Sequence, residues 1–162
     1  MARPYYDAQI PPILYFTGAH GFLSNFYTLS SMYPVCLDGD YYRTVEHAYQ
    51  AAKTLDANWR RTIAGAPTAG YAKRNGRRAP LRDGWDAMKI DVMRMLLVQK
   101  FQDAYLQERL LRTGDAQLIE GNTWGDVFWG CCGGRGENHL GRLLMEIRFD
   151  LIEARELDRA EM

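Results

Sequence analysis

The chain of 162 residues lacks a net charge, since 20 Lys and Arg side chains balance 20 Asp and Glu side chains. Without a net field, nonspecific attraction to nucleic acid or to an anionic membrane is not expected. The sequence also has no apolar run long enough to span a bilayer, and it does not begin with the basic-then-apolar pattern of a secretory signal. We therefore expect a cytoplasmic protein that makes no membrane contact.

Cysteine is scarce, and two of the three, Cys131 and Cys132, are adjacent while Cys36 lies far from them. An odd number at this spacing makes a poor disulfide framework. His139 follows the adjacent pair, but the spacing matches none of the usual zinc-ligand patterns. We therefore expect free thiols, no metal ion and no cofactor.

Hydrophobic residues are plentiful, at 47% of the chain, which is enough for one sizeable core at this length. Residues 33–43 predict a β-hairpin, because the Asp38-Gly39 pair tolerates the positive φ angles of a tight turn. A strand is predicted over residues 116–122, and residues 12–18 are apolar and rich in strand-forming side chains. The sheet content is therefore expected to be small.

From Thr44 onward the pattern is mostly helical. Thr44 is expected to cap a helix that runs to about Leu55, and Asp56 to cap the next one. The later predicted segments are a short one that stops at Gly76, an amphipathic helix over 86–102, a helix ended by Gly114, a glycine-rich loop over 130–136 and a long helix from about Asn138. Together they predict one compact α+β domain over residues 1–162, mainly helical with a small sheet. Its core spans about 13–152, and its C-terminal end frays.

A polar stripe runs along the first predicted helix, where Glu46, Gln50 and Lys53 share one face. Most such stripes are solvated helix surfaces. This one carries few charges for a surface helix, and aromatic, strand-like sequence that can cover it lies beside it. If the stripe lines a cleft, the pKa of Glu46 rises, which suits proton transfer near neutral pH. The pKa of Lys53 falls, which frees its amine as a nucleophile.

Basic and aromatic side chains gather in two further stretches. Five basic residues stand close together and can hold phosphates: Lys73, Arg74, Arg77, Arg78 and Arg82. Trp85 follows and can stack on a flat ring, although a basic loop with a core tryptophan fits equally well. Asp126 lies between Trp124 and Trp129, where it is either a second functional carboxylate or the cap of a turn. Near the last helix, Asn138 is expected to act as the cap and to serve a ligand as well.

These segments, taken together, resemble the NADAR family. The matching motifs occur in family order and cover about residues 16–148: GFLSNFY (21–27), TVEHAYQAAK (44–53), AKRNGR (72–77), RDGW (82–85), QKF (99–101), LLRTGDAQLIE (110–120), GDVFWG (125–130) and GENHLGRLLMEIR (136–148). The order of the set is specific, although each motif alone is weak. The chain departs from the commoner pattern at Gly84, Cys132 and His139, and its approach to Asp126 is longer than usual. These departures leave the substrate open.

The resemblance implies an N-glycosidase, which cleaves the bond between a ribose anomeric carbon and a nitrogen. Family substrates include ribosylamino-pyrimidine intermediates of riboflavin synthesis and ADP-ribose attached to guanine. The family's functional residues fall on Glu46, Trp85 and Asp126, and Lys53 is expected as a third catalytic group beside the two acids. The expected substrate-binding residues are Asn25, Phe26, Gln50, Arg77, Trp85, Trp129, Gly130 and Asn138.

In the expected mechanism, Glu46 transfers the proton, Asp126 orients ribose or water, and Trp85 stacks on the departing base. In a second route, the ribose ring opens and Lys53 forms a Schiff base with it. The rival class is a module that binds ADP-ribose or a nucleotide without cleaving it and has no need of Glu46. A third interpretation is a DNA-associated protein that acts on a modified base. The expected partners are thus a small nucleotide-like substrate and, in the third case, ADP-ribosylated nucleic acid.

Overall fold

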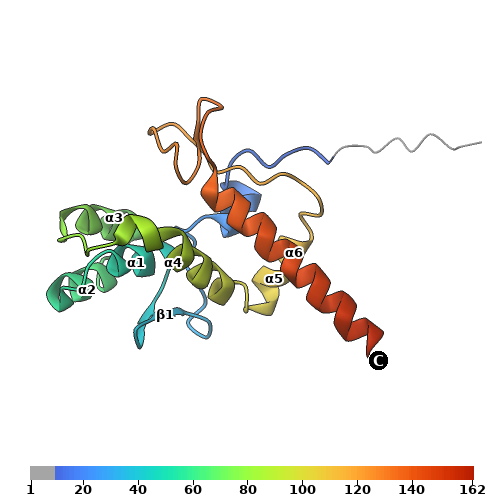
Figure 1. The fold of residues 1–162 in the computed structure, drawn as a ribbon, viewed down its shortest axis with the longest axis horizontal. Coiled ribbons are helices and arrows are strands. Elements are labelled where there is room, and N and C mark those ends of the chain that lie inside the picture. Colours follow the sequence, from blue (N-terminus) through green and yellow to red (C-terminus); the bar gives the residue numbers. More distant parts are fainter. Residues whose placement is uncertain (1–9) are drawn as a thin grey trace, which may run out of the picture.

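The structure, a computed structural model, describes residues 10–162, and helices make up most of it (Figure 1). In chain order the elements are η1 (Gly18–Leu23), β1 (Val35–Leu37), β2 (Asp40–Tyr42), α1 (Val45–Ala52), α2 (Ala57–Ala64), α3 (Ala69–Arg78), α4 (Trp85–Lys100), α5 (Ala104–Leu111), β3 (Gly121–Asn122), β4 (Cys131–Cys132) and α6 (His139–Ala160). This confirms the predicted α+β class, mainly helical with little sheet. Within residues 10–162, no helix combines the length and the apolar character needed to cross a bilayer.

In the part of the chain that the structure describes, the named strands form two small two-stranded sheets. The predicted hairpin is confirmed: β1 pairs antiparallel with β2, and Asp38 and Gly39 have φ angles of 52° and 89°. The strand predicted over residues 116–122 shortens to β3, which pairs in parallel with β4. Before β3, Leu118 forms an isolated parallel bridge with Ile13. This bridge is the strand-like pairing that residues 12–18 make.

The caps of α1 and α2 are the residues that the sequence predicts. Thr44 Oγ1 accepts the N–H of His47 at 3.1 Å, and Asp56 Oδ1 accepts the N–H of Asn58 at 2.8 Å. Helix α1 ends at Ala52, earlier than the predicted Leu55. The chain must leave the helix there, because the residues that follow turn directly into the cap of α2.

The predicted stop at Gly76 is wrong, since α3 continues through it to Arg78. Gly76 is buried against α1, where a Cβ would overlap the side chain of Gln50. Glycine stands here because two helices approach closely, and not because a helix ends.

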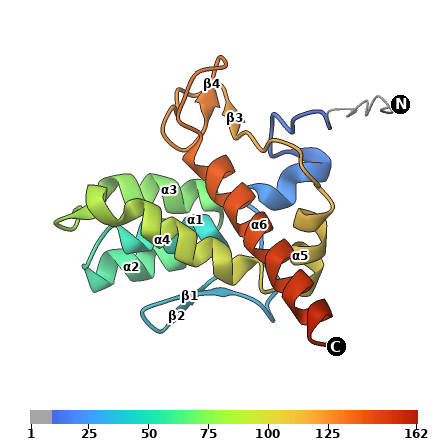
Figure 2. The same cartoon turned by 45° about the vertical axis from the view of Figure 1, so that its right-hand side comes forward.

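Helix α1 lies in the middle of the molecule, and all of its eight residues are buried. It contacts α2, α3, α4 and both strands of the hairpin, and α6 in turn crosses α4 (Figure 2). The core draws on α1, α4 and α6 and on the segments before α1, and Leu96, Leu97 and Leu144 are fully buried in it. The polar stripe of α1 is therefore an interior feature of the fold.

Helix α6 depends on a close backbone contact at Gly141, where a Cβ would overlap the carbonyl oxygen of Leu118. We expect Gly141→Ala to lower the free energy of unfolding by about 3 kcal/mol, because a backbone oxygen yields less easily than a side chain. Urea unfolding followed by circular dichroism measures this loss. Gly70→Ala in α3 is the matched control: its Cβ would meet Thr68 Oγ1 at an ordinary 3.7 Å, so stability should stay or rise by up to about 1 kcal/mol. Equal effects of the two changes would contradict the close contact.

Candidate active site

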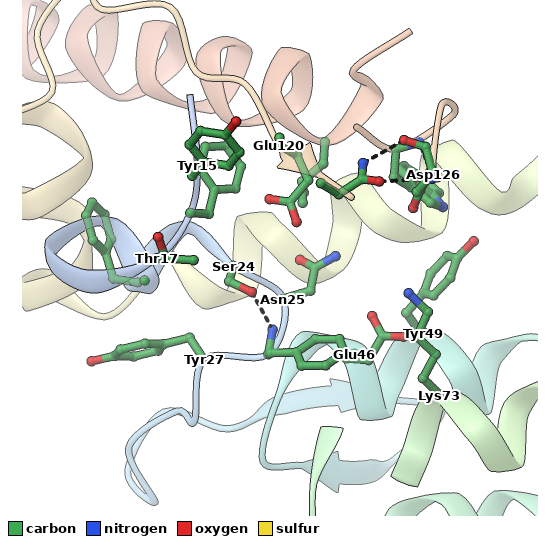
Figure 3. A pocket seen from close by; sticks show the side chains of 18 of the residues that line it. Tyr15, Thr17, Ser24, Asn25, Tyr27, Glu46, Tyr49, Lys73, Glu120 and Asp126 are labelled. Carbon is green, nitrogen blue, oxygen red and sulfur yellow. Dashed lines mark hydrogen bonds between the residues drawn. The ribbon is translucent and has the colours of Figure 1, made fainter. Parts of the chain in front are cut away.

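A cavity of about 790 Å³ opens beside α1, between the segment around Asn25 and the loop that joins β3 to β4 (Figure 3). Three carboxyl side chains and two lysines are among the groups that line it: Glu46, Glu120, Asp126, Lys53 and Lys73. Aromatic rings, including those of Tyr49 and Trp129, form much of the remaining wall. Such a mixture of apolar walls and a few converging polar groups is typical of a ligand site.

Glu46 is the buried acid of this cavity, with 6% of its surface exposed. Its N–H donates to the carbonyl oxygen of Asn25 at 3.0 Å, and its Oε1 accepts from Gln50 Nε2 at 2.6 Å. Burial raises the pKa of Glu46, while the hydrogen bond from Gln50 and the charge of Lys73 oppose this rise. Glu46 is therefore held in one orientation, in surroundings that favour its protonated form.

Lys53 lies at the C-terminal end of α1 and also lines the cavity. Its Nζ is 5.2 Å from the centre of the Tyr49 ring. Burial lowers the pKa of Lys53; the charge of Glu46 opposes this shift, and the charge of Lys73 adds to it. The amine of Lys53 thus loses its proton more readily here than on an open surface.

Asp126 caps a turn, which is one of the two roles that the sequence leaves open, and it stands in the cavity wall. Its Oδ1 accepts the N–H groups of Phe128 and Trp129, at 3.2 and 2.9 Å, so it caps a turn. Asn122 Oδ1 accepts the N–H of Asp126 at 3.0 Å, and Asn122 Nδ2 donates to the carbonyl oxygen of Asp126 at 2.7 Å. Asp126 also lines the cavity, so the capped turn presents it to a ligand.

The structure places the other predicted residues in two groups. Four line the cavity: Asn25, Phe26, Gln50 and Trp129. Four lie outside its lining: Arg77, Trp85, Gly130 and Asn138. Arg77 is exposed on α3, and Trp85 is 5% exposed, with its ring centre 5.3 Å from that of Tyr49. Trp85 thus lies outside the lining, whereas Tyr49, which packs against it, lines the cavity; stacking of Trp85 on a base stays a prediction.

Asn138 stands at the N-cap position of α6, as the sequence predicts, but its side chain makes no capping hydrogen bond. At a φ of 53°, it donates from Nδ2 to the carbonyl oxygen of Leu118 at 2.9 Å. Its Oδ1 accepts the N–H of Glu120 at 3.0 Å. Gly130 is close to the same segment, because a Cβ there would overlap the Glu120 carbonyl oxygen. Both residues support the wall that carries Glu120 and do not themselves face the cavity.

Sequence reasoning missed Tyr49, Glu120 and Trp124 as cavity residues, and it saw Lys73 only as part of a basic cluster. Of that cluster, Lys73 alone lines the cavity. Its Nζ lies 5.9 Å from the Phe26 ring centre and 5.8 Å from that of Trp124. These two rings are 46% and 62% exposed, so they flank the mouth of the cavity. A signal for Glu120 was present, since an acid directly follows the apolar run of the predicted strand.

Lys100 is fully buried beneath the segment that carries Asn25. Its Nζ donates to the carbonyl oxygen of Ser24 at 2.9 Å, and burial lowers its pKa to about 7. Among residues 10–162, no group of three or more His, Cys, Asp or Glu side chains is placed to hold a metal ion. Cys36, Cys131 and Cys132 are free thiols.

Comparison with known proteins adds independent information. The family model for the NADAR domain matches residues 15–152. N-glycosidase YbiA of Escherichia coli is 42% identical over 136 residues, or 82% of each chain. An N-glycosidase of Nostoc punctiforme is 39% identical over 82% of this chain and 86% of its own, and a riboflavin biosynthesis protein of Vibrio vulnificus is 38% identical over 83% of this chain but 36% of its own. The NMR structure of E. coli YbiA superposes with a TM-score of 0.74 at 38% identity, over 89% of this chain and 87% of that one.

Proposed function

The chain belongs to the NADAR family and is a hydrolase of N-glycosyl bonds, and we propose that the cavity around Glu46 is its active site. The single observation that carries this proposal is the burial of the Glu46 carboxyl in a ligand-sized cavity that also receives Lys53 and Asp126. A module that only binds has no need of a proton donor, whereas an acid whose pKa is raised by burial is suited to protonating a leaving group.

The substrate that fits is a ribose phosphate or ADP-ribose joined through its anomeric carbon to a base nitrogen. Lys73 offers positive charge to phosphate, and oxygen acceptors in the wall offer hydrogen bonds to sugar hydroxyls. The exposed rings of Phe26 and Trp124 flank the mouth and offer flat faces to a base. Two classes meet this description: ADP-ribosylated guanine and a ribosylamino-pyrimidine of riboflavin synthesis.

Cleavage follows from the state of Glu46. The protonated carboxyl gives its proton to the leaving nitrogen as the bond to the anomeric carbon breaks, and positive charge develops on the sugar. Water then adds to the anomeric carbon and returns a proton to Glu46, so the acid is restored. Asp126 orients the ribose or the water from the opposite wall.

Lys53 offers the same cavity a covalent route. Ring opening breaks the bond between the anomeric carbon and the ring oxygen, and leaves that carbon double bonded to the base nitrogen. The neutral Nζ of Lys53 adds to the anomeric carbon, and the base leaves with a proton from Glu46. Water then hydrolyses the resulting protonated Schiff base, which releases the sugar aldehyde, regenerates the amine and returns the proton to Glu46. The lowered pKa of Lys53 supports this route, because only the neutral amine attacks.

The function is tested by incubating the protein with ADP-ribosylated guanosine and, separately, with a ribosylamino-pyrimidine phosphate. We expect at least one of them to be cleaved: the first into guanosine and an equal amount of ADP-ribose, or the second into the free pyrimidine and ribose phosphate. Liquid chromatography measures the products. Titration calorimetry with the same compounds is run in parallel. Binding without release of base would reject the hydrolase and support the module that only binds.

A further inference from the structure

Glu120 is an acid of the cavity to which the mechanism above gives no role. It lies directly before β3, and its carboxyl points into the cavity from the wall opposite Glu46 (Figure 3). The segment around Asn25 lies between the two acids in this view. Both acids line the same cavity, so a ligand that fills it meets Glu46 and Glu120.

The backbone at Glu120 is held from several sides. Its N–H donates to Asn138 Oδ1 at 3.0 Å, and its carbonyl oxygen accepts the N–H of Cys131 at 2.8 Å. The next residue, Gly121, donates its N–H to the carbonyl oxygen of Leu14 at 3.1 Å. Gly130 lets the facing strand come close, because a Cβ there would overlap the Glu120 carbonyl. A side chain on such a fixed support is suited to recognition, because little conformational freedom is lost when a ligand binds.

The carboxyl itself is left without a partner. Among residues 10–162, no donor lies within hydrogen-bond distance of the buried Glu120 Oε2. Asn25 Oδ1 and Gln50 Oε1, which belong to other residues of the same cavity, are also buried acceptors without a donor. Buried acceptors left open are costly, so their gathering around one cavity indicates a ligand that brings several donors.

Neighbouring hydroxyls are the donors that best match a carboxylate. Burial raises the pKa of Glu120 to about 7, and Asp126 adds to this rise while Lys73 opposes it. Above that pH the group is ionised and only accepts hydrogen bonds, with both oxygens. A sugar with two adjacent hydroxyls offers two O–H donors at the spacing of the two oxygens. A base offers N–H groups instead, and the experiment below separates these ligands.

We propose that Glu120 binds the vicinal hydroxyls of the substrate ribose and makes the site select ribose over 2-deoxyribose. This inference rests on the proposed function of the cavity. Hydrogen bonds to the 2-hydroxyl strengthen as charge develops at the anomeric carbon, so the contact acts on kcat as well as on binding. Glu120 is thus a specificity-determining residue, on the wall across from the proton donor.

The test compares Glu120→Gln with the wild-type chain on a cleaved substrate and on its 2′-deoxy analogue, at a pH of about 8. The amide keeps the size of the side chain but loses one acceptor oxygen and the charge. We expect kcat/KM for the ribose substrate to fall about 100-fold and that for the deoxy analogue to change less than about 5-fold. Equal losses on both substrates would overturn the proposal, because Glu120 would then act on the base, on the proton or on the fold.

A binding measurement keeps this outcome separate from the proposed function. Ribose 5-phosphate and 2-deoxyribose 5-phosphate are titrated into the wild type, Glu120→Gln and Glu153→Gln, which alters an exposed acid of α6. Wild type and Glu153→Gln should prefer the ribose compound, and Glu120→Gln should lose this preference even if no base is ever released. An unchanged preference in Glu120→Gln, with an unchanged Tm, would reject the role of Glu120 alone. Failure of base release with this preference intact would reject hydrolysis and leave the sugar contact standing.

Discussion

Glu46→Gln is expected to lower kcat by a factor of about 1,000 or more while the protein remains folded. The amide has nearly the shape of the carboxyl, and Gln50 Nε2 can still donate to its oxygen at position 46. It cannot give a proton to the leaving nitrogen or take one from water. Initial rates at saturating substrate measure the loss, and Glu153→Gln is the control with an unchanged rate.

Stability separates this catalytic loss from misfolding, and its sign follows from the pKa. Burial raises the pKa of Glu46 in the folded state, so between the unfolded and the folded pKa the folded protein binds more protons than the unfolded chain. The free energy of unfolding contributed by this group therefore falls as pH rises through that range. The neutral amide carries no such penalty. Glu46→Gln should consequently be as stable as the wild type at neutral pH, or more stable, and a clearly lower Tm would count against our assignment of the acid.

Lys53→Met and Lys53→Arg are expected to be equally inactive, each with kcat lowered by a factor of about 1,000 or more. The lysine at this position has its pKa lowered by burial, so at any given pH a larger fraction of the amine is neutral than for a lysine in open water. Arginine keeps the positive charge beside Glu46 but stays protonated and cannot attack the anomeric carbon. If the charge alone matters, Lys53→Arg should instead retain much of the activity that Lys53→Met loses.

Borohydride reduction during turnover completes the comparison. In the wild type it should trap an adduct whose mass equals that of the chain plus the reduced sugar product, with the modification on Lys53. Neither Lys53 variant should form it. A wild-type reaction that turns over fully without any trapped adduct would exclude the covalent route and leave water as the nucleophile. Lys73→Met serves as a control, since it removes a second cavity lysine that this route does not modify.

Local signals account for the parts of the fold that could be predicted from sequence. The Asp38-Gly39 turn and the caps Thr44 and Asp56 depend on hydrogen bonds and φ angles within a few residues, so the pattern alone identifies them. Helical spacing also places Glu46 and Gln50 on one face. Spacing does not reveal whether that face meets water, because burial depends on α2, α3 and α4 packing around α1.

The missed features all depend on contacts between distant segments. Gly76 resembles a helix stop in sequence, and only the neighbouring α1 shows why glycine is needed inside α3. Trp85 and Tyr49 are equally buried aromatic residues near the site, and only the packed structure shows that Tyr49, and not Trp85, lines the cavity. Asn138 is a residue type that commonly caps helices, yet its side-chain amide is hydrogen-bonded to the backbone of Leu118 and Glu120, before β3. No local sequence rule predicts these two hydrogen bonds.

The contact at Gly76 has a consequence for how loss-of-activity data on this protein are interpreted. Any side chain at this position would press on Gln50, whose amide holds the Glu46 carboxyl in place. Substitutions at Gly76 will therefore lower the activity indirectly, because they displace Gln50 and so disturb the orientation of the Glu46 carboxyl. A mutational scan of activity would therefore rank Gly76 as sensitive as Glu46, although Gly76 does not line the cavity that receives the sugar.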